Sequence, residues 1–186
     1  MDNYLGKDES GIFIIQDNKI VTSQVGIPVP SPRTPNGIVA GWFFDVTGGA
    51  DPKRNPKYTI INNAIRARGK TSVGIMAFTD GVVIGANAVV TEGADANFLF
   101  LASANGYIAH NKIEGTGSHA FHITPRKPLT GSNNVLVGND MSQFKATVVD
   151  VFFDKGAKNN VFSGSSGTVT DLGEANQITG LKPVSK

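Results

Sequence analysis

A short pattern, apolar-x-x-Asn-x-apolar, recurs along the chain at a nearly fixed interval. Its asparagines are Asn63, Asn87 and Asn111, which lie 24 residues apart, and Asn139, which follows after 28 residues. Glycines and apolar residues between the asparagines keep the same register from unit to unit. A repeat of this length indicates a solenoid, because a single unit cannot bury its apolar face until neighbouring units stack on it.

Composition indicates which kind of solenoid the repeat builds. The 186 residues include 22 Gly, and 18 Val and 15 Ile stand against only 7 Leu. β-branched residues favour strands and glycine favours bends, whereas good helix formers are scarce. We therefore predict an all-β protein made of short strands. Leucine-rich repeats, which also carry a recurring asparagine, are the alternative, and the scarcity of leucine argues against them.

Stacked turns made of strands lie about 4.8 Å apart, so equivalent residues of successive turns form ladders through the interior. The repeated asparagine suits a bend, where its amide bonds to main-chain groups or to the next asparagine. An earlier copy around Asn18 opens a longer unit that ends in WFFD at 42–45. We predict one domain, with a polar N-terminal cap at 1–11, coils over 12–180 and a tail at 181–186.

Three segments carry a resemblance to a known superfamily: YIAHNKIEGTG at 107–117, NNVLVGND at 133–140 and NNVFSGSSGTVTDLGEANQITG at 159–180. The sequence resembles the right-handed parallel β-helix proteins, the pectate-lyase-like solenoids. The resemblance implies a single-stranded right-handed parallel β-helix of about six coils, with loop insertions on one edge. It implies no single activity, since the superfamily contains lyases, hydrolases, epimerases, tailspikes and adhesins. It favours an extracellular or cell-surface location.

The second strand of each repeat has an unusual outer face. Alternation along a strand sends the aliphatic positions inward and leaves aromatic, histidine and charged positions outside. Exposed apolar patches mark surfaces that something else covers. The residues predicted to point outward are Gly74, Met76, Phe78, Phe98, Phe100, Ala102, His122, Thr124, Arg126, Asp150, Phe152 and Asp154, together with Phe43 and Asp45 of the first long unit.

The length differences between repeats follow this strand, at 46–57, 127–133 and 155–159. Insertions on one side of a solenoid often line its binding face. The formal net charge is only +2, yet a cationic rim is predicted along this edge. Its basic residues are Lys53, Arg54, Lys57, Arg126, Lys127, Lys155 and Lys158.

If the register is constant, His122 lies over Asp150, and Arg126 lies over Asp154. A histidine oriented by a carboxylate could act as a general base, with Arg126 stabilising negative charge. The catalytic candidates are therefore His122, Arg126 and Asp150. The alternative interpretation is that these are ordinary surface ion pairs, each worth under about 1 kcal/mol.

Hydrolysis of a glycoside normally needs two carboxyls roughly 5 to 9.5 Å apart. Four residues of strand separate Asp150 from Asp154 by about 13 Å, which is too far. A lyase or epimerase, which needs a base and cationic side chains, fits the residues better. The acidic cluster that binds calcium in the superfamily's lyases has no counterpart here.

Several classes are not expected. Three histidines and no cysteine make a metal site improbable, and we expect no cofactor. No apolar run approaches the roughly 18 residues of a membrane span, and no nucleic-acid-binding motif is present. The predicted partners are therefore a polysaccharide or other copies of the chain, not nucleic acid or a membrane.

Three hypotheses follow for the outer face. It binds, and in one version processes, an anionic polysaccharide along the aromatic strand and the basic rim. It is instead the homo-oligomer interface of a structural or adhesive rod, as in a tailspike. Or the proline-rich segment 25–37 covers it as ordinary core. The residues predicted to bind polysaccharide are Met76, Phe78, Phe98, Phe100, Phe152, Lys127, Asp154 and Lys155.

Overall fold

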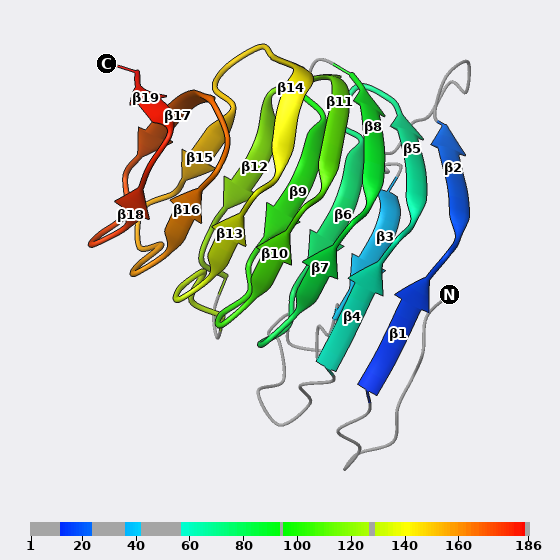
Figure 1. Ribbon diagram of the computed structural model, residues 1–186, viewed down its shortest axis with the longest axis horizontal. Helices are drawn as coiled ribbons and strands as arrows, with labels where there is room; N and C mark the ends of the chain where they lie inside the picture. The colour runs from blue at the N-terminus through cyan, green and yellow to red at the C-terminus, as the bar shows by residue number, and fades with distance from the viewer. Residues whose placement is uncertain (1–11, 24–35, 42–56, 94, 127–128, 185–186) are drawn as a thin grey trace.

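A computed structural model describes residues 12–23, 36–41, 57–93, 95–126 and 129–184, with the side chain of Phe100 left out (Figure 1). The described residues form strands and no helix. All strand pairs lie parallel, in three sheets that we name A, B and C. The predicted all-β class with parallel pairing is confirmed, and the arrangement is compatible with a parallel β-helix.

Up to β15 the chain visits the sheets in the order A, B, C and returns to sheet A, so each of these coils gives one strand to each sheet (Figure 1). Sheet A consists of β1 (Ile12–Gln16), β4 (Lys57–Ile61), β7 (Val83–Gly85), β10 (Tyr107–Ala109), β13 (Val135–Val137), β16 (Val161–Ser163) and β18 (Gln177–Ile178). Sheet B consists of β2 (Lys19–Ser23), β5 (Ala64–Arg68), β8 (Ala88–Glu92), β11 (Lys112–Gly117) and β14 (Asp140–Ala146). Sheet C consists of β3 (Asn36–Ala40), β6 (Val73–Ala77), β9 (Asn97–Leu101), β12 (His119–Ile123), β15 (Val151–Phe153), β17 (Gly167–Asp171) and β19 (Leu181–Pro183).

The repeat holds three strands where two were predicted, because a bend splits the asparagine-containing run between sheets A and B. The residue before each ladder asparagine adopts a left-handed conformation, with φ of 55° at Asn62, 52° at Ala86, 55° at His110 and 61° at Gly138. The repeated asparagine itself does not occupy the left-handed position, although asparagine tolerates that conformation. The bend requires the side-chain amide of the asparagine, which bonds to main-chain groups there.

The predicted asparagine ladder is confirmed at this A/B corner. The Nδ2 of Asn63 donates to Oδ1 of Asn87 at 2.9 Å, and the Nδ2 of Asn87 donates to Oδ1 of Asn111 at 2.9 Å. The same amides donate to strand carbonyls, as from Asn87 to Ile60 at 2.9 Å. The column runs from Asn18 to Asn139. Each amide thereby satisfies main-chain groups that the bend removes from the strand ladders.

A second ladder, which the sequence pattern did not reveal, lies at the C/A corner of the later coils. Asn134 donates to Asn160 at 2.9 Å, and Asn160 donates to Asn176 at 3.0 Å. In the earlier coils the equivalent inward positions are apolar, and Phe13 stacks on Tyr58 with ring centroids 5.1 Å apart. Both amide and apolar side chains therefore fit the same corner.

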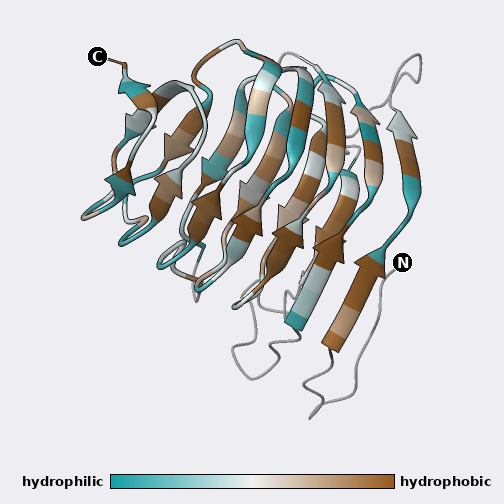
Figure 2. Cartoon of the chain, viewed as in Figure 1, coloured by the Kyte–Doolittle hydropathy of each residue, from teal (hydrophilic) through white to brown (hydrophobic). Residues whose placement is uncertain are grey.

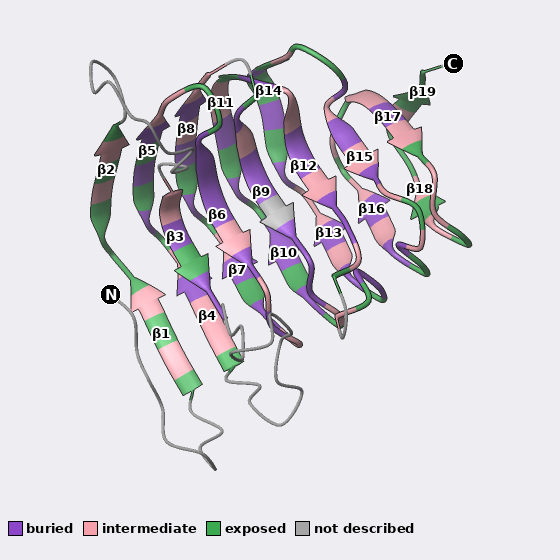
Figure 3. Ribbon diagram, turned by 180° about the vertical axis from the view of Figure 1, so that it is seen from behind, coloured by how far each residue is buried: buried purple, intermediate pink, exposed green. Residues whose placement is uncertain are grey.

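The core lies between the three sheets, where inward columns of apolar side chains stack from coil to coil. In Figure 3 the buried class follows these columns along sheets A and C through the middle coils. The sheet A column is Ile60, Ile84, Ile108, Leu136 and Phe162, all with 0% exposure. The inward ladders of sheet C, including Ile75, Leu99, Ile123 and Val151, are also buried as predicted.

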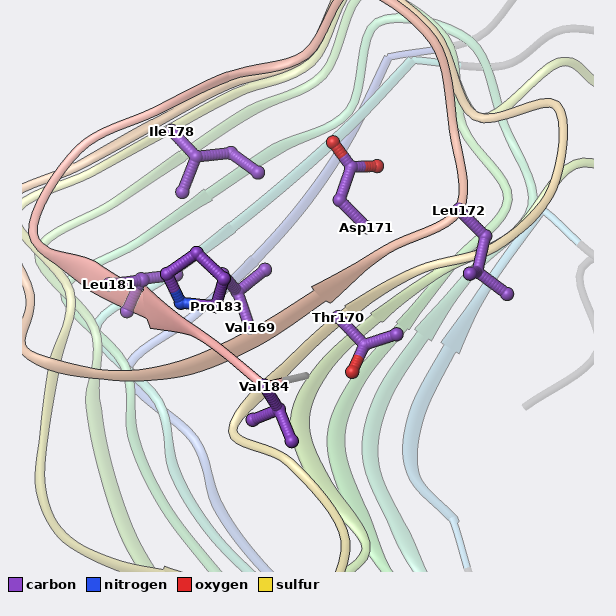
Figure 4. Close-up of a pocket in the computed structure, with 8 residues that line it drawn as sticks. All are labelled: Val169, Thr170, Asp171, Leu172, Ile178, Leu181, Pro183 and Val184. Carbon is purple, nitrogen blue, oxygen red and sulfur yellow. The ribbon is translucent and has the colours of Figure 1, made fainter. Parts of the chain in front are cut away.

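The C-terminal coils become shorter and omit sheet B, which ends at β14. An open cavity of about 440 Å³ remains at this end of the solenoid. Figure 4 shows the residues that line it, among them Ile178, Leu181 and Asp171. Strand β19, which lies within the predicted tail, pairs with β17. The predicted N-terminal cap, the segment 25–35 and the WFFD segment with Phe43 and Asp45 lie outside the described residues.

Candidate functional site

The register of sheet C differs from the constant register that we predicted. Phe121 pairs with Leu99, two residues short of the expected period, and Phe121 pairs with Val151, two residues beyond the shift of 28. One residue of the second difference comes from a register shift within β14, opposite Lys112 to Glu114 of β11. Slips of two residues preserve which side chains face outward but change which ones are neighbours.

His122 consequently lies beside Phe152 and not beside Asp150. The carboxylate of Asp150 bonds instead to Thr168, accepting from its main-chain N and from its Oγ1, both at 2.8 Å. The predicted stack of Arg126 over Asp154 is also wrong, because Thr124 occupies that place and its Oγ1 donates to Asp154 at 3.0 Å. The structure therefore separates Asp150 from the other two catalytic candidates.

Phe98 was predicted to point outward, and it is fully buried. Its ring packs edge-on against Phe121 with centroids 5.2 Å apart. Small residues on the neighbouring strands, Gly74 and Ala120, are themselves buried and leave space beside it. Alternation fails at this end of sheet C because Phe98 and Leu99 both enter the core. Ala102, also predicted to point outward, is buried as well.

The same break in alternation brings two histidines to the outer face. Ala120 and Phe121 are both buried, so His119 and His122 lie outside despite their spacing of three. The His119 ring stacks on Phe152 at 5.2 Å and meets the His122 ring edge-on at 5.4 Å. His122 also contacts Phe152 edge-on at 5.2 Å. His119 was not among the predicted site residues, because only the true register of β12 against β15 brings it beside Phe152.

These three rings continue a column across sheet C. Pairing places Met76 beside Phe100, Phe100 beside His122, and Phe152 beside Thr170. Met76, His122 and Phe152 are all half-buried, as is Phe78 near the end of β6. The outer face thus carries a row of apolar and imidazole side chains, which the register slip makes more continuous than the sequence predicted.

Burial lowers the pKa of both histidines. The pKa of His122 falls to about 4, chiefly because burial disfavours the imidazolium and also because His119 lies beside it, while Asp154 acts in the opposite direction. Burial likewise lowers the pKa of His119, partly offset by the hydrogen bond of its Nδ1 with the Val149 carbonyl at 2.9 Å. Both rings are therefore neutral near pH 7, and each can donate and accept hydrogen bonds.

Polar groups line one edge of the ring cluster. The Oδ2 of Asp154 lies 3.8 Å from Nε2 of His122, and its Oδ1 accepts from the main-chain N of Lys155 at 2.7 Å. Arg126 is exposed and bonds through its main chain to Leu129 in a narrow turn. The Asp154 carboxylate thus lies beside the His122 ring, and Arg126 and the exposed Lys155 follow β12 and β15 at the same end of sheet C.

The predicted basic rim is only partly cationic. Lys158 pairs with Glu174 at 2.7 Å, and Lys57 lies 4.0 Å from Asp80 and donates to its carbonyl at 3.1 Å. Lys53, Arg54 and Lys127 lie outside the described residues. Among the described members of the rim, Arg126 and Lys155 lie closest in sequence and structure to the ring cluster.

Within the described ranges, no three His, Asp or Glu side chains lie close enough together to hold a metal ion. No helix long and apolar enough to cross a membrane occurs in the same part of the chain. No family model, curated protein or solved structure matches this sequence.

Proposed function

We propose that the chain is a single right-handed parallel β-helix of about six coils, akin to the pectate-lyase-like solenoids, that binds a polysaccharide along the outer face of sheet C. The observation that carries the proposal is the ring cluster of His119, His122 and Phe152, which extends the column begun by Met76. Sugar rings present apolar C–H faces that pack on aromatic rings, and hydroxyls that neutral imidazoles can bond.

Charge around the cluster supports an anionic sugar. Arg126 and Lys155 border the rings and could meet carboxylate or sulfate groups of the chain. Asp154 can accept hydrogen bonds from sugar hydroxyls on the same edge. The face is a shallow surface on stacked strands, so a polymer that lies across several coils fits it better than a small molecule enclosed in a pocket.

Binding is better supported than processing. A general base works best when its pKa lies near the working pH, and His122 has a pKa of about 4. Asp150, the residue expected to make His122 more basic, is engaged by Thr168. A lyase or epimerase activity through His122 and Arg126 is therefore the less favoured version of the proposal.

The test is titration of alginate, pectate and sulfated glycosaminoglycans, with neutral glucans for comparison, followed by calorimetry. We expect acidic polymers to bind and Phe152→Ala to weaken binding by about tenfold or more. Val21→Ala, on the outer face of sheet B, is the matched apolar control. Arg126→Ala should weaken binding of acidic polymers only, whereas Arg66→Ala on sheet B should not.

Ultraviolet absorbance of the same mixtures would detect unsaturated sugar ends from a lyase. New absorbance that His122→Ala abolishes would establish processing. If none of the polymers binds, the proposal fails, and a structural or adhesive rod becomes the better interpretation.

A further inference from the structure

The outer face of sheet A is apolar and carries no charge over its middle strands. Strands β7, β10, β13 and β16 read VIG, YIA, VLV and VFS. Figure 2 shows nearly continuous hydrophobic colour along these strands, while the strands of sheet B alternate with hydrophilic bands. Parallel strands with continuous apolar runs are typical of sheets that are covered on both faces.

The side chains that point outward from sheet A are substantially exposed in the single chain. Tyr107 is 47% exposed and Val83 is 36% exposed. They belong to one outward column, which pairing continues through Val135 and Val161. On sheet B, by contrast, the outward positions include Arg66 and charged neighbours, so that face is suited to water.

Large and small side chains lie next to each other on the outer face of sheet A. Beside the column of Val83 and Tyr107 runs a second outward column that contains Gly85 and Ala109. Gly85 is half-buried, whereas Ala109, its partner on the adjacent strand, is 3% exposed, so the shallow hollow beside Tyr107 lies at Gly85, which has no side chain. A surface with a ridge beside a hollow can fit a second copy of itself.

Gly85 has no internal reason to be glycine. A Cβ built there would lie 3.5 Å from the Ala109 carbonyl oxygen and 3.8 Å from Cγ2 of Ile61, which are ordinary contacts. Its φ is not left-handed, unlike those of Gly81 and Gly138. At Gly74 of sheet C, in contrast, a Cβ would lie 2.5 Å from Val89. Glycine inside a strand weakens the strand and often marks the close approach of another group from outside.

We propose that a second copy of the chain packs on the outer face of sheet A, with Tyr107 of each copy seated over Gly85 of the other. A two-fold axis makes each contact occur twice, because the same surface serves both partners. An uncharged face brings no like charges together when it meets its own copy. Two such sheets would pack face to face at about 10 Å. The outer face of sheet C takes no part in this contact and remains available.

Gly85→Val separates association from folding. Valine favours the strand conformation and its Cβ meets only ordinary contacts at this position, so we expect the folded chain to be at least as resistant to heat as the parent. The same valine fills the hollow, so the dissociation constant of the dimer should rise at least about tenfold. Ala88→Val, at an exposed position on sheet B of the same coil, is the control and should leave association unchanged.

Light scattering and analytical ultracentrifugation of the full chain provide the measurement. A concentration-dependent dimer that Gly85→Val and Val83→Lys both dissociate supports the proposal. A parent chain that stays monomeric up to its solubility limit overturns it, as does a dimer that survives both substitutions.

Cross-linking tests the geometry directly, because the chain has no cysteine of its own. Gly85→Cys and Tyr107→Cys are made as separate variants, mixed and oxidised. We expect disulfide-linked dimers that contain one chain of each kind to exceed those formed by either variant alone. Equal or lower yields of the mixed species would reject the arrangement.

Discussion

The asparagine ladder at the A/B corner and the histidine cluster on sheet C are both rows of polar side chains that stack from coil to coil. They differ in surroundings and in chemistry. The ladder amides from Asn63 to Asn139 are buried and hydrogen-bonded and never change charge, as at Asn87 with 1% exposure. The cluster lies at the surface and contains two titratable rings whose pKa values burial has lowered. The buried amides therefore stabilise the fold, whereas the histidines at the surface are accessible to a ligand.

The largest effect should come from removing one ladder amide. Asn87→Ala removes the side-chain acceptor of the Asn63 main-chain N, and it takes one hydrogen bond each from Nδ2 of Asn63, the Ile60 carbonyl and Oδ1 of Asn111. We expect the free energy of unfolding to fall by on the order of 4 kcal/mol. Urea unfolding at about pH 5 and about pH 8 should give the same loss, because amides do not titrate.

Gln143→Ala removes an exposed amide from sheet B and should change the free energy of unfolding by less than about 0.5 kcal/mol. An equal effect of the two substitutions would contradict the assigned role of the ladder.

The histidine cluster should show the opposite behaviour, a strong dependence on pH. The unfolded chain takes up a proton at His122 near pH 6.5, whereas the folded chain does so only at about 4. The unfolded state therefore binds more protons in this window, and stability falls as the pH drops from about 6.5 toward 4. The loss amounts to roughly 3 kcal/mol at most.

His122→Gln should remove this part of the pH dependence in urea unfolding measured at several pH values. His110→Gln, at an exposed bend, should keep it. If His122→Gln follows the parent curve, then the imidazole does not titrate as its surroundings indicate.

The point where the second ladder begins can be tested at Gly106. A Cβ there would lie 2.7 Å from Oδ1 of Asn134, which now accepts from the Gly106 main-chain N at 2.8 Å. Gly106→Ala should therefore lower the free energy of unfolding by about 2 kcal/mol. Gly85→Ala is the matched control, since that position has room, and thermal unfolding should show it unchanged or slightly stabilised.

Much of this architecture follows from the sequence. The interval between Asn63, Asn87 and Asn111 predicts the parallel stacking and the ladder, because equal spacing along equal coils places equivalent residues in a column. The inward or outward direction of most sheet C side chains also follows, since alternation survives slips of two residues. The second ladder at Asn134 could not be predicted, because its earlier equivalents are apolar.

The site was harder to predict, for a local reason. The identity of the neighbour of His122 depends on every residue inserted since the last coil, and the irregularity in β14 is not visible in the pattern of residue types. The burial of Phe98 depends on the small neighbours Gly74 and Ala120, which matter only once the strands are aligned. The neighbours and burial of individual side chains were therefore harder to predict than the repeat length.

The smallest predicted effect concerns the end of the second ladder. Asp171 accepts from Nδ2 of Asn176 at 2.8 Å and from the main-chain N of Gly173 at 2.9 Å. Both bonds lie at the surface, so Asp171→Ala should lower the free energy of unfolding by only about 1 kcal/mol. Thermal unfolding measures this loss. Glu174→Ala is the control, because it removes a nearby carboxylate that pairs with Lys158 and so shows the effect of losing one negative charge without losing the contact to Asn176.

Both ladders run with one polarity, since each Nδ2 donates toward the following coil, from Asn63 to Asn87 and from Asn134 to Asn160. Aligned amide dipoles add along the axis and polarise one another. At the last member of the second ladder this donor is not left over, because Nδ2 of Asn176 donates to the carboxylate of Asp171 at 2.8 Å. An anionic acceptor thus closes the row with the charge that complements its final N–H group.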